Sequence, residues 1–174
     1  FPFPLVGHTR YAAIGLTMFE NDDMDLFREK QNPENENQIW ENDHWENMIV
    51  REEIIKIKNE EDTVIKIRNT RHGPIMNGVV KDIAKSETEP VSAWWIFTKF
   101  PSQTLQAAYL FSHAKKIDDV RLAASLVHAP GLNIMYGDAD GNIAWWAAAK
   151  LAKRPPHVQS KLILDGASGK DEPL

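Results

Sequence analysis

Two stretches of the chain carry the apolar and polar pattern of β-hairpins. In residues 48–70, isoleucine alternates with lysine or arginine in both halves, and the acidic stretch 59–62 separates them. The alternating residues are Ile55, Lys56, Ile57 and Lys58 in the first half and Ile65, Lys66, Ile67 and Arg68 in the second. A period of two is the side-chain spacing of a half-buried strand. The pattern therefore predicts a hairpin with an isoleucine face in the core and a basic face in solvent.

A second hairpin is predicted over residues 131–155, and the rest of the chain is organised around it. Two apolar arms, 132–136 and 143–149, flank a turn at 137–142 that is built from Gly, Asp, Ala and Asn. Asp, Gly and Asn supply the tight or positive-φ positions that such a turn needs. Asn133 is polar within its apolar arm, and burying its amide unpaired would cost about 1–3 kcal/mol. Asn133 therefore either bonds to nearby backbone or has a functional role.

The remaining pattern predicts further strands and two helices. Residues 11–18 have strand composition, and residues 91–99 form a β-type run typical of a buried central strand. The polar segment 28–47 is expected to be a surface loop with a short strand near Ile39 and Trp40. Two helices are expected, with Ser102 and Asp118 as their N-caps. Their expected core faces consist of Leu105, Ala108, Tyr109 and Ser112 in the first helix and Val120, Ala124 and Val127 in the second. This order of elements predicts one α+β domain over residues 1–174.

Composition narrows the class of protein. The chain has 174 residues, 43% of them hydrophobic, which suffices for one packed domain. Its 20 basic and 25 acidic residues give a net charge of −5 without a basic stripe, so we expect no nucleic-acid partner. No apolar run is long enough for a membrane span, and the absence of cysteine excludes disulfides from this chain. Because the sequence starts with Phe1 instead of Met, we expect a piece of a longer protein.

An acidic cluster follows the first predicted strand. Asp22, Asp23 and Asp25 lie within four residues, and such carboxylates repel one another unless they are solvated or neutralised by a cation. Clustered oxygen ligands suit Ca²⁺. The alternative is a solvated acidic turn at the start of a helix, which the residues alone favour. None of the histidines shows a metal-ligand spacing such as H-E-x-x-H.

Three landmarks occur in an order that resembles the penicillin acylase (penicillin amidase) family. The segment from Asn133 to Arg154 resembles the family pattern N-x-x-Y-x-D-x-x-G-N-I followed by P-x-R or a near variant. Residues 70–75 match T-x-H-G-P-(I/V), in which we assign His72 a structural role in shaping a turn. Residues 22–25 resemble a calcium-binding stretch of the family. Ile14 departs from the pattern, because the family commonly has Trp at this core position.

The resemblance implies a fold and a set of site residues. The family has the αββα four-layer sandwich of the N-terminal-nucleophile hydrolases, of which this chain would form a part. By this resemblance the Asn133 side chain is one oxyanion donor, the backbone N–H of Met18 is the second, and Arg154 positions substrate or the terminal amine. The resemblance also implies one structural calcium ion. Its ligands here would be Asp22, the carbonyl of Met24 and Asp25.

The resemblance further implies a processed precursor with a catalytic serine. The family frees a Ser at a new chain start, and its α-amine acts as the base for amide cleavage through an acyl-enzyme. The first serine here is Ser86, and no serine has the expected S-N-x-W/A context. We therefore expect the nucleophile to lie upstream, in a β-subunit of which this chain is a portion, and this chain alone to be inactive.

Partners and location follow from the same resemblance. The expected partners are a small acyl-amide substrate, the α-subunit and the remainder of the β-subunit, and the expected location is the periplasm or the exterior of a bacterium. Penicillins, acyl-homoserine lactones, glutaryl-cephalosporins and N-acyl amino acids are all hydrolysed within the family, so the substrate stays open. The alternative function is a non-catalytic ligand-binding or assembly module that keeps the fold.

Overall fold

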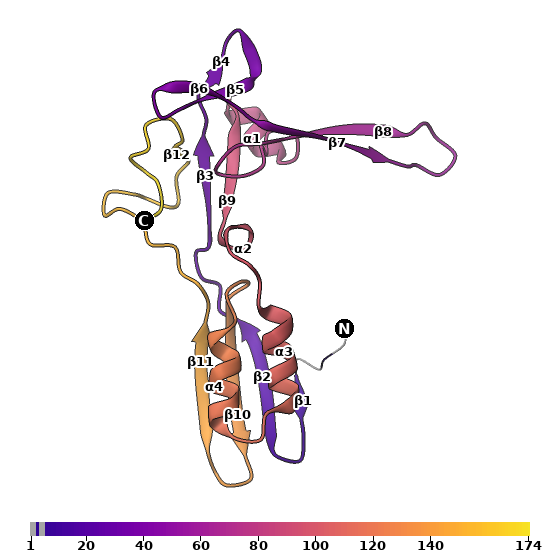
Figure 1. Ribbon diagram of the computed structural model, residues 1–174, viewed down its shortest axis with the longest axis vertical. Helices are drawn as coiled ribbons and strands as arrows, with labels where there is room; N and C mark the ends of the chain where they lie inside the picture. The colour runs from indigo at the N-terminus through magenta and orange to yellow at the C-terminus, as the bar shows by residue number, and fades with distance from the viewer. Residues whose placement is uncertain (1–2, 4–5) are drawn as a thin grey trace. The chain divides into compact units, whose positions relative to one another are not determined.

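Two compact units make up the chain in the computed structural model, which describes residue 3 and residues 6–174 (Figure 1). Unit 1 comprises Phe1–Asp23 and Ile96–Ala152, and unit 2 comprises Met24–Trp95 and Lys153–Leu174. This grouping does not test the expectation of a single domain over residues 1–174, which stays a prediction.

A four-stranded antiparallel sheet is the centre of unit 1. Its strands, in the order β1-β2-β10-β11, are β1 (Gly7–His8), β2 (Ala12–Met18), β10 (Leu132–Asp138) and β11 (Ile143–Ala148). The helices α3 (Thr104–His113) and α4 (Ile117–Ser125) lie across one face of this sheet, and the short α2 (Ile96–Lys99) precedes them (Figure 1). The predicted hairpin over residues 131–155 is therefore confirmed, with β10 as a central strand.

The core of unit 1 lies between this sheet and its helices. Strand alternation directs Ile134 and Tyr136 of β10 toward the helices, and both are buried. The helices contribute apolar side chains to this core, mainly those of Ala107, Phe111, Val120, Ala123 and Ala124. Asn133, Met135 and Trp145 alternate with the core residues and so lie on the opposite face, where Trp145 is 64% exposed. This second face is uncovered within the described residues.

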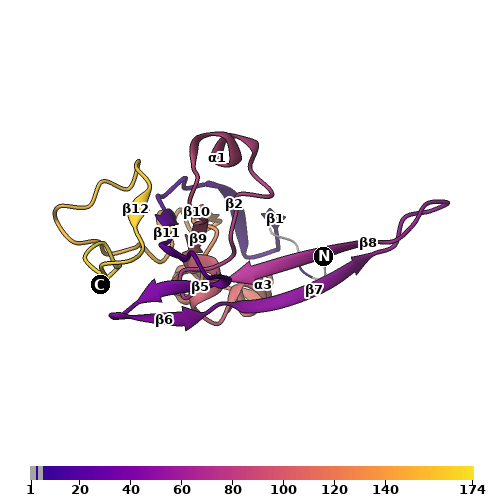
Figure 2. The same cartoon turned by 90° about the horizontal axis from the view of Figure 1, so that it is seen from above.

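Unit 2 holds three smaller sheets, which Figure 2 shows from above. The first is β12-β3-β9, made of β3 (Met24–Arg28), β9 (Val91–Trp95) and β12 (Leu164–Asp165), with β12 parallel to β3. The second contains β4 (Gln31–Asn32), β5 (Asn35–Glu41) and β6 (His44–Asn47). The third pairs β7 (Ile49–Ile55) with β8 (Thr63–Asn69), and α1 (Lys81–Ser86) follows it.

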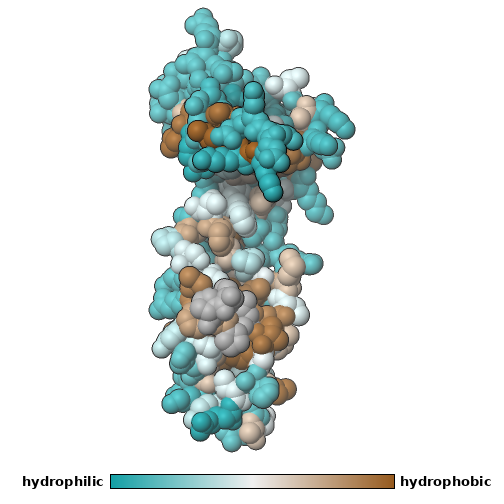
Figure 3. Space-filling view, turned by 90° about the vertical axis from the view of Figure 1, so that its right-hand side faces the viewer, coloured by the Kyte–Doolittle hydropathy of each residue, from teal (hydrophilic) through white to brown (hydrophobic). Residues whose placement is uncertain are grey.

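The predicted hairpin over residues 48–70 is confirmed, but its predicted buried face is wrong. Ile54 is 64% exposed, and Ile55 and Ile65 are also exposed. Figure 3 shows brown apolar surface among teal polar side chains in this part of the molecule. The two strands pair only with each other, so neither face meets a second layer within the described residues. Alternation correctly predicted the strands, but burial depends on a covering layer that local pattern cannot reveal.

Three other expectations need correction. The run 91–99 is a strand only to Trp95, because β3, its partner, begins at Met24 directly opposite. The helix expected after Ser102 buries Ala107, Ala108 and Phe111, whereas Leu105 and Tyr109 are exposed. Tyr109 instead stacks on His113 at its surface. The segment 28–47 forms β4, β5 and β6, so the short strand expected near Ile39 and Trp40 is present as β5, and much of the expected loop is strand as well.

Candidate active site

Asn133 lies on the open face of the unit 1 sheet, at the start of a central strand. It pairs with Thr17 of β2 on one side and with Ala147 of β11 on the other. Gly131, two residues before Asn133, leaves no room for a side chain at the start of β10, because a Cβ at this position would overlap the Asn21 side-chain oxygen. Asn21 is packed tightly here, and its Nδ2 is buried without an acceptor among the described residues. The chain is thus held closely just before Asn133.

The Asn133 amide is oriented by two hydrogen bonds of opposite polarity. Its Nδ2 donates to the carbonyl oxygen of Met18 at 2.9 Å, and its Oδ1 accepts from Nε1 of Trp145 at 3.0 Å. An asparagine amide carries two donor hydrogens. The bond to Met18 uses one of them, and the second has no acceptor among the described residues. Asn133 therefore bonds to backbone, as one interpretation of the sequence held, and still offers an N–H for chemistry.

Met18, whose backbone N–H is the candidate second donor, lies beside Asn133. The N–H of Phe19 donates to the carbonyl of Gly131 at 3.0 Å, so these two residues form a hydrogen-bonded pair of the antiparallel ladder. Met18 and Leu132 are the next pair. Because such pairs alternate, the N–H of Met18 is turned away from β10. The structure thus brings the two predicted donors to one end of the same sheet, and the Met18 side chain there is 69% exposed.

Arg154, the third predicted site residue, belongs to unit 2. Its Nε donates to both carboxylate oxygens of Asp25, at 3.0 and 2.9 Å. Asp25 is 1% exposed and the Arg154 side chain is 15% exposed, so this is a largely buried ion pair. The structure therefore joins a predicted active-site residue to a predicted calcium ligand.

The proposed calcium ligands form an incomplete set in this chain. Asp22 belongs to unit 1, whereas Met24 and Asp25 belong to unit 2, and the carboxylate of Asp25 is bound by Arg154. Calcium takes six to eight oxygen ligands, and these residues supply roughly half of that number. No group of three or more acidic, histidine or cysteine side chains among the described residues could hold a metal. The calcium site therefore stays a prediction, and no chemical step here depends on it.

A buried cluster in unit 2 surrounds His72, in the turn where a structural role was expected. His72 is 1% exposed, and its Nδ1 lies 2.8 Å from Glu29 while its Nε2 lies 2.8 Å from Glu172. Its ring stacks on Phe27 at a centroid distance of 4.0 Å. The neighbouring Gly73 has a φ of +149°, and a Cβ there would overlap the carbonyl of Ala93. The T-R-H-G-P segment thus holds an ion cluster in a turn that requires glycine.

The pKa values in this cluster favour its charged form. Burial acts to lower the pKa of His72, but hydrogen bonds to Glu172 and Glu29 outweigh it and the pKa is raised. Burial acts to raise the pKa of Glu172, but the hydrogen bonds and positive charges of His72 and Arg71 together outweigh it, and the pKa is lowered. Sequence reasoning missed Glu29, because it opens a polar segment and is nonetheless fully buried. Its side-chain partners are 41 residues away or more, so no local signal could identify it.

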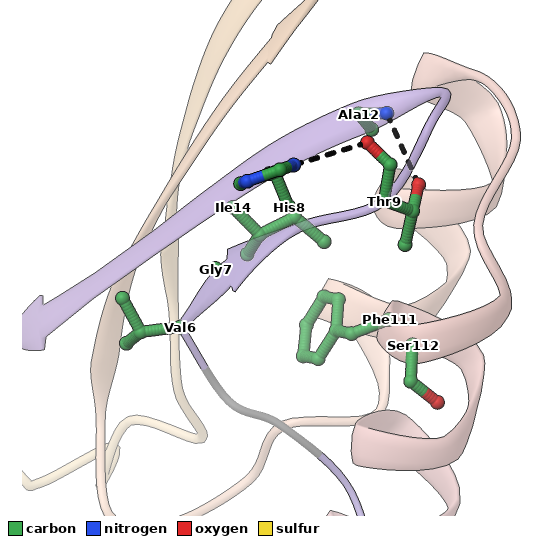
Figure 4. A pocket seen from close by; sticks show the side chains of 8 residues that line it. All are labelled: Val6, Gly7, His8, Thr9, Ala12, Ile14, Phe111 and Ser112. Carbon is green, nitrogen blue, oxygen red and sulfur yellow. Dashed lines mark hydrogen bonds between the residues drawn. The ribbon is translucent and has the colours of Figure 1, made fainter.

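Unit 1 also contains a cavity of about 330 Å³ between β1, β2 and α3 (Figure 4). Phe111 and Ser112 of α3 line one side of it, and His8, Ala12 and Ile14 line the other. None of the predicted site residues belongs to its lining. Ile14 and Ala12 point to the helix side of the sheet, so this cavity is on the face opposite Asn133.

Comparison with known proteins decides the family. The family model described as penicillin amidase matches residues 1–173. The chain belongs to the penicillin amidase family. Acyl-homoserine lactone acylase QuiP of Pseudomonas fluorescens is 25% identical over 158 residues, which is 88% of this chain and 19% of the relative. Penicillin G acylase of Escherichia coli is 23% identical over 147 residues, which is 83% of this chain and 16% of the relative.

A solved structure agrees with this assignment. The thermostable penicillin G acylase from Alcaligenes faecalis superposes with a TM-score of 0.87 at 28% identity, over 100% of this chain and 30% of that chain. The expected fold class, part of an N-terminal-nucleophile hydrolase fold, is thereby confirmed. The chain spans about a fifth of the length of the curated relatives. Among the described helices, none is both long and apolar enough to cross a bilayer.

Proposed function

We propose that these residues form part of an amidohydrolase that cleaves the amide bond of an N-acyl compound through an acyl-enzyme. The observation that carries this proposal is the Asn133 amide, fixed beside Met18 at one end of a sheet in a member of the penicillin amidase family. Its unused N–H is a donor that can meet the oxygen on which negative charge develops in acyl transfer. The related proteins are acylases by name, which supports amide hydrolysis in general.

The chemistry we assign to this chain is stabilisation of the oxyanion. As a nucleophile adds to the amide carbon, the carbonyl double bond becomes a C–O⁻ single bond, and the new charge needs donors that are already in position. The Asn133 Nδ2–H and the Met18 N–H are assigned this role. One such donor is worth about 3–4 kcal/mol of transition-state stabilisation, or roughly 10²–10³ in kcat. Neither group exchanges a proton in this step.

The nucleophile in this proposal is a serine outside the 174 residues, at the processed start of a β-subunit. Its Oγ bonds to the acyl carbon while its proton passes to its own α-amine, and that amine then protonates the departing nitrogen as the C–N bond breaks. Water hydrolyses the acyl-enzyme by the reverse pattern. Arg154 is assigned to positioning the substrate or the terminal amine, and its bond to Asp25 orients the guanidinium.

In this proposal the chain works together with further chains and a structural ion. We propose that the working enzyme also contains an α-subunit and the remainder of the β-subunit from the same precursor, in the periplasm or outside a bacterial cell. The uncovered face that carries Trp145 and the exposed isoleucine hairpin support this, because both leave apolar surface in solvent. Calcium bound through Asp22, the Met24 carbonyl and Asp25 is proposed as a structural ion.

The rival proposal is a non-catalytic binding or assembly module with the same fold. The test uses the full-length protein that contains these residues. Mass spectrometry of the purified protein is expected to show a chain that starts with serine, and hydrolysis of a chromogenic phenylacetyl amide or an acyl-homoserine lactone is expected with saturation kinetics. An unprocessed protein that hydrolyses neither compound would favour the non-catalytic module.

A further inference from the structure

Trp145 holds the Asn133 amide from the neighbouring strand β11, on the same face of the sheet. The two residues lie diagonally across β10 and β11, because Trp145 pairs with Met135 while Asn133 pairs with Ala147. Diagonal neighbours on one face are within reach of a large side chain. The indole Nε1 donates to Asn133 Oδ1 at 3.0 Å, although the Trp145 side chain is otherwise exposed.

This bond selects one of two amide orientations. An asparagine amide can rotate by about 180° with almost no change in shape, which exchanges its oxygen and its NH₂. Indole Nε1 can only donate a hydrogen bond, so it stabilises the amide orientation that turns the oxygen toward it and cannot bond to the NH₂. On the other side, the Met18 carbonyl is an acceptor only and requires the NH₂. Both contacts therefore favour the same orientation, and a rotated amide would lose both.

We propose that Trp145 is a positioning residue that keeps the donor hydrogens of Asn133 on the Met18 side, where the second proposed donor lies. This inference rests on the proposed oxyanion role of Asn133. Donors stabilise a developing charge most when they need no reorientation as it forms. Without the indole N–H, rotated amides present an oxygen to the oxyanion, and the fraction of productive molecules falls.

The test compares Trp145→Phe with wild type in the full-length enzyme, using a chromogenic phenylacetyl amide. Phe keeps an aromatic ring but removes the N–H. We expect kcat to fall by about 3- to 10-fold, the factor that one hydrogen bond of ordinary strength supports, while KM changes less than about twofold. Rates are normalised to sites titrated with a serine-reactive sulfonyl fluoride, so a smaller folded fraction does not alter the result. Unchanged kcat per titrated site would overturn the inference.

The double variant Asn133→Ala/Trp145→Phe separates this inference from the proposed function. If Trp145 acts through Asn133, the double variant should have the kcat of Asn133→Ala, because there is no amide left to orient. A further 3- to 10-fold loss would show that Trp145 acts by another route, which overturns the inference and leaves the role of Asn133 intact. If Asn133→Ala alone has normal kcat, the proposed function itself is wrong.

A matched control lies next to Trp145 in the chain. Trp146 faces the helices and packs against Tyr136, with ring centroids 6.4 Å apart. Trp146→Phe makes the same chemical change on the opposite face of the same strand. It is expected to leave kcat per titrated site unchanged. An equal loss of kcat in both variants would attribute the effect of Trp145→Phe to β11 in general and would contradict the inference.

Discussion

The Nε of Arg154 donates to both carboxylate oxygens of Asp25, at 3.0 and 2.9 Å, across 129 residues of sequence. This contact ties the segment after β11 to β3 within unit 2. Asp25 is 1% exposed and was predicted as a calcium ligand, and Arg154 was predicted in the active site. Each is satisfied in part by the other, so a change at either residue will affect both.

Removal of the Asp25 charge should destabilise the protein strongly. In Asp25→Asn, the largely buried guanidinium of Arg154 loses the charge of Asp25, and breaking a buried pair from one side costs about 3–5 kcal/mol. The free energy of unfolding of the full-length protein, measured by urea denaturation, should fall by that amount. The double variant Asp25→Asn/Arg154→Gln should recover part of the loss. If the double variant is no more stable than Asp25→Asn, the contribution of Asp25 to stability does not come from its pair with Arg154.

The predicted calcium site is tested by the melting temperature of the protein with and without calcium. If Asp22 and the Met24 carbonyl help to bind calcium, the melting temperature of the full-length protein should rise with saturating calcium and fall with a chelator, because a ligand that binds only the folded state stabilises it. Asp22→Asn should reduce the response without disturbing the pair between Asp25 and Arg154. A melting temperature that is the same with calcium and with chelator would rule out the site.

The His72 cluster predicts a pH window of added stability. The raised pKa of His72 means that its contribution is complete below pH 6.5 and is lost as pH rises through the folded-state pKa. The lowered pKa of Glu172 means that its contribution is complete above pH 4.5 and is lost as pH falls through the folded-state pKa. The difference in unfolding free energy between wild type and His72→Gln should therefore be largest between pH 4.5 and 6.5.

A control for this window is His157, which is exposed and pairs with Asp171 at 3.1 Å. Surface pairs contribute about 0–1 kcal/mol, so His157→Gln should change stability little at any pH. Urea denaturation within the window and above it compares the two variants. A pH-independent difference between wild type and His72→Gln would mean that the cluster does not titrate as described.

Local chemistry made parts of the fold predictable from the sequence. The turn of the second hairpin could be predicted because Asp138 accepts from the backbone N–H groups of Asp140 and Asn142, and Gly141 takes a φ of +86°. These contacts span at most four residues. The polarity of Asn133 likewise marked it as needing partners, and the family resemblance indicated where its backbone neighbour would lie.

Other features depend on register and on distant segments. The bond from Trp145 to Asn133 follows only when β10 and β11 are paired residue by residue, since a shift by one would place Trp145 on the helix side. Glu172 reaches His72 over 100 residues, and the buried Glu29 has partners from two distant segments, Thr70 and His72 in one and Ser92 in the other. The exposed isoleucines of β7 and β8 show the same limit, because a strand pattern does not say what covers it.

The measurement that tests the account most directly is the rate of acylation in Asn133→Ala, within the full-length enzyme and beside its melting temperature. If the amide stabilises the oxyanion, kcat should fall by about 10²–10³-fold while the protein stays folded. If Asn133 only stabilises the sheet through its hydrogen bonds, the variant should lose about 1–2 kcal/mol of stability and acylate at nearly the normal rate per folded molecule. Normal single-turnover acylation by Asn133→Ala would contradict the placement of the active site at this end of β10.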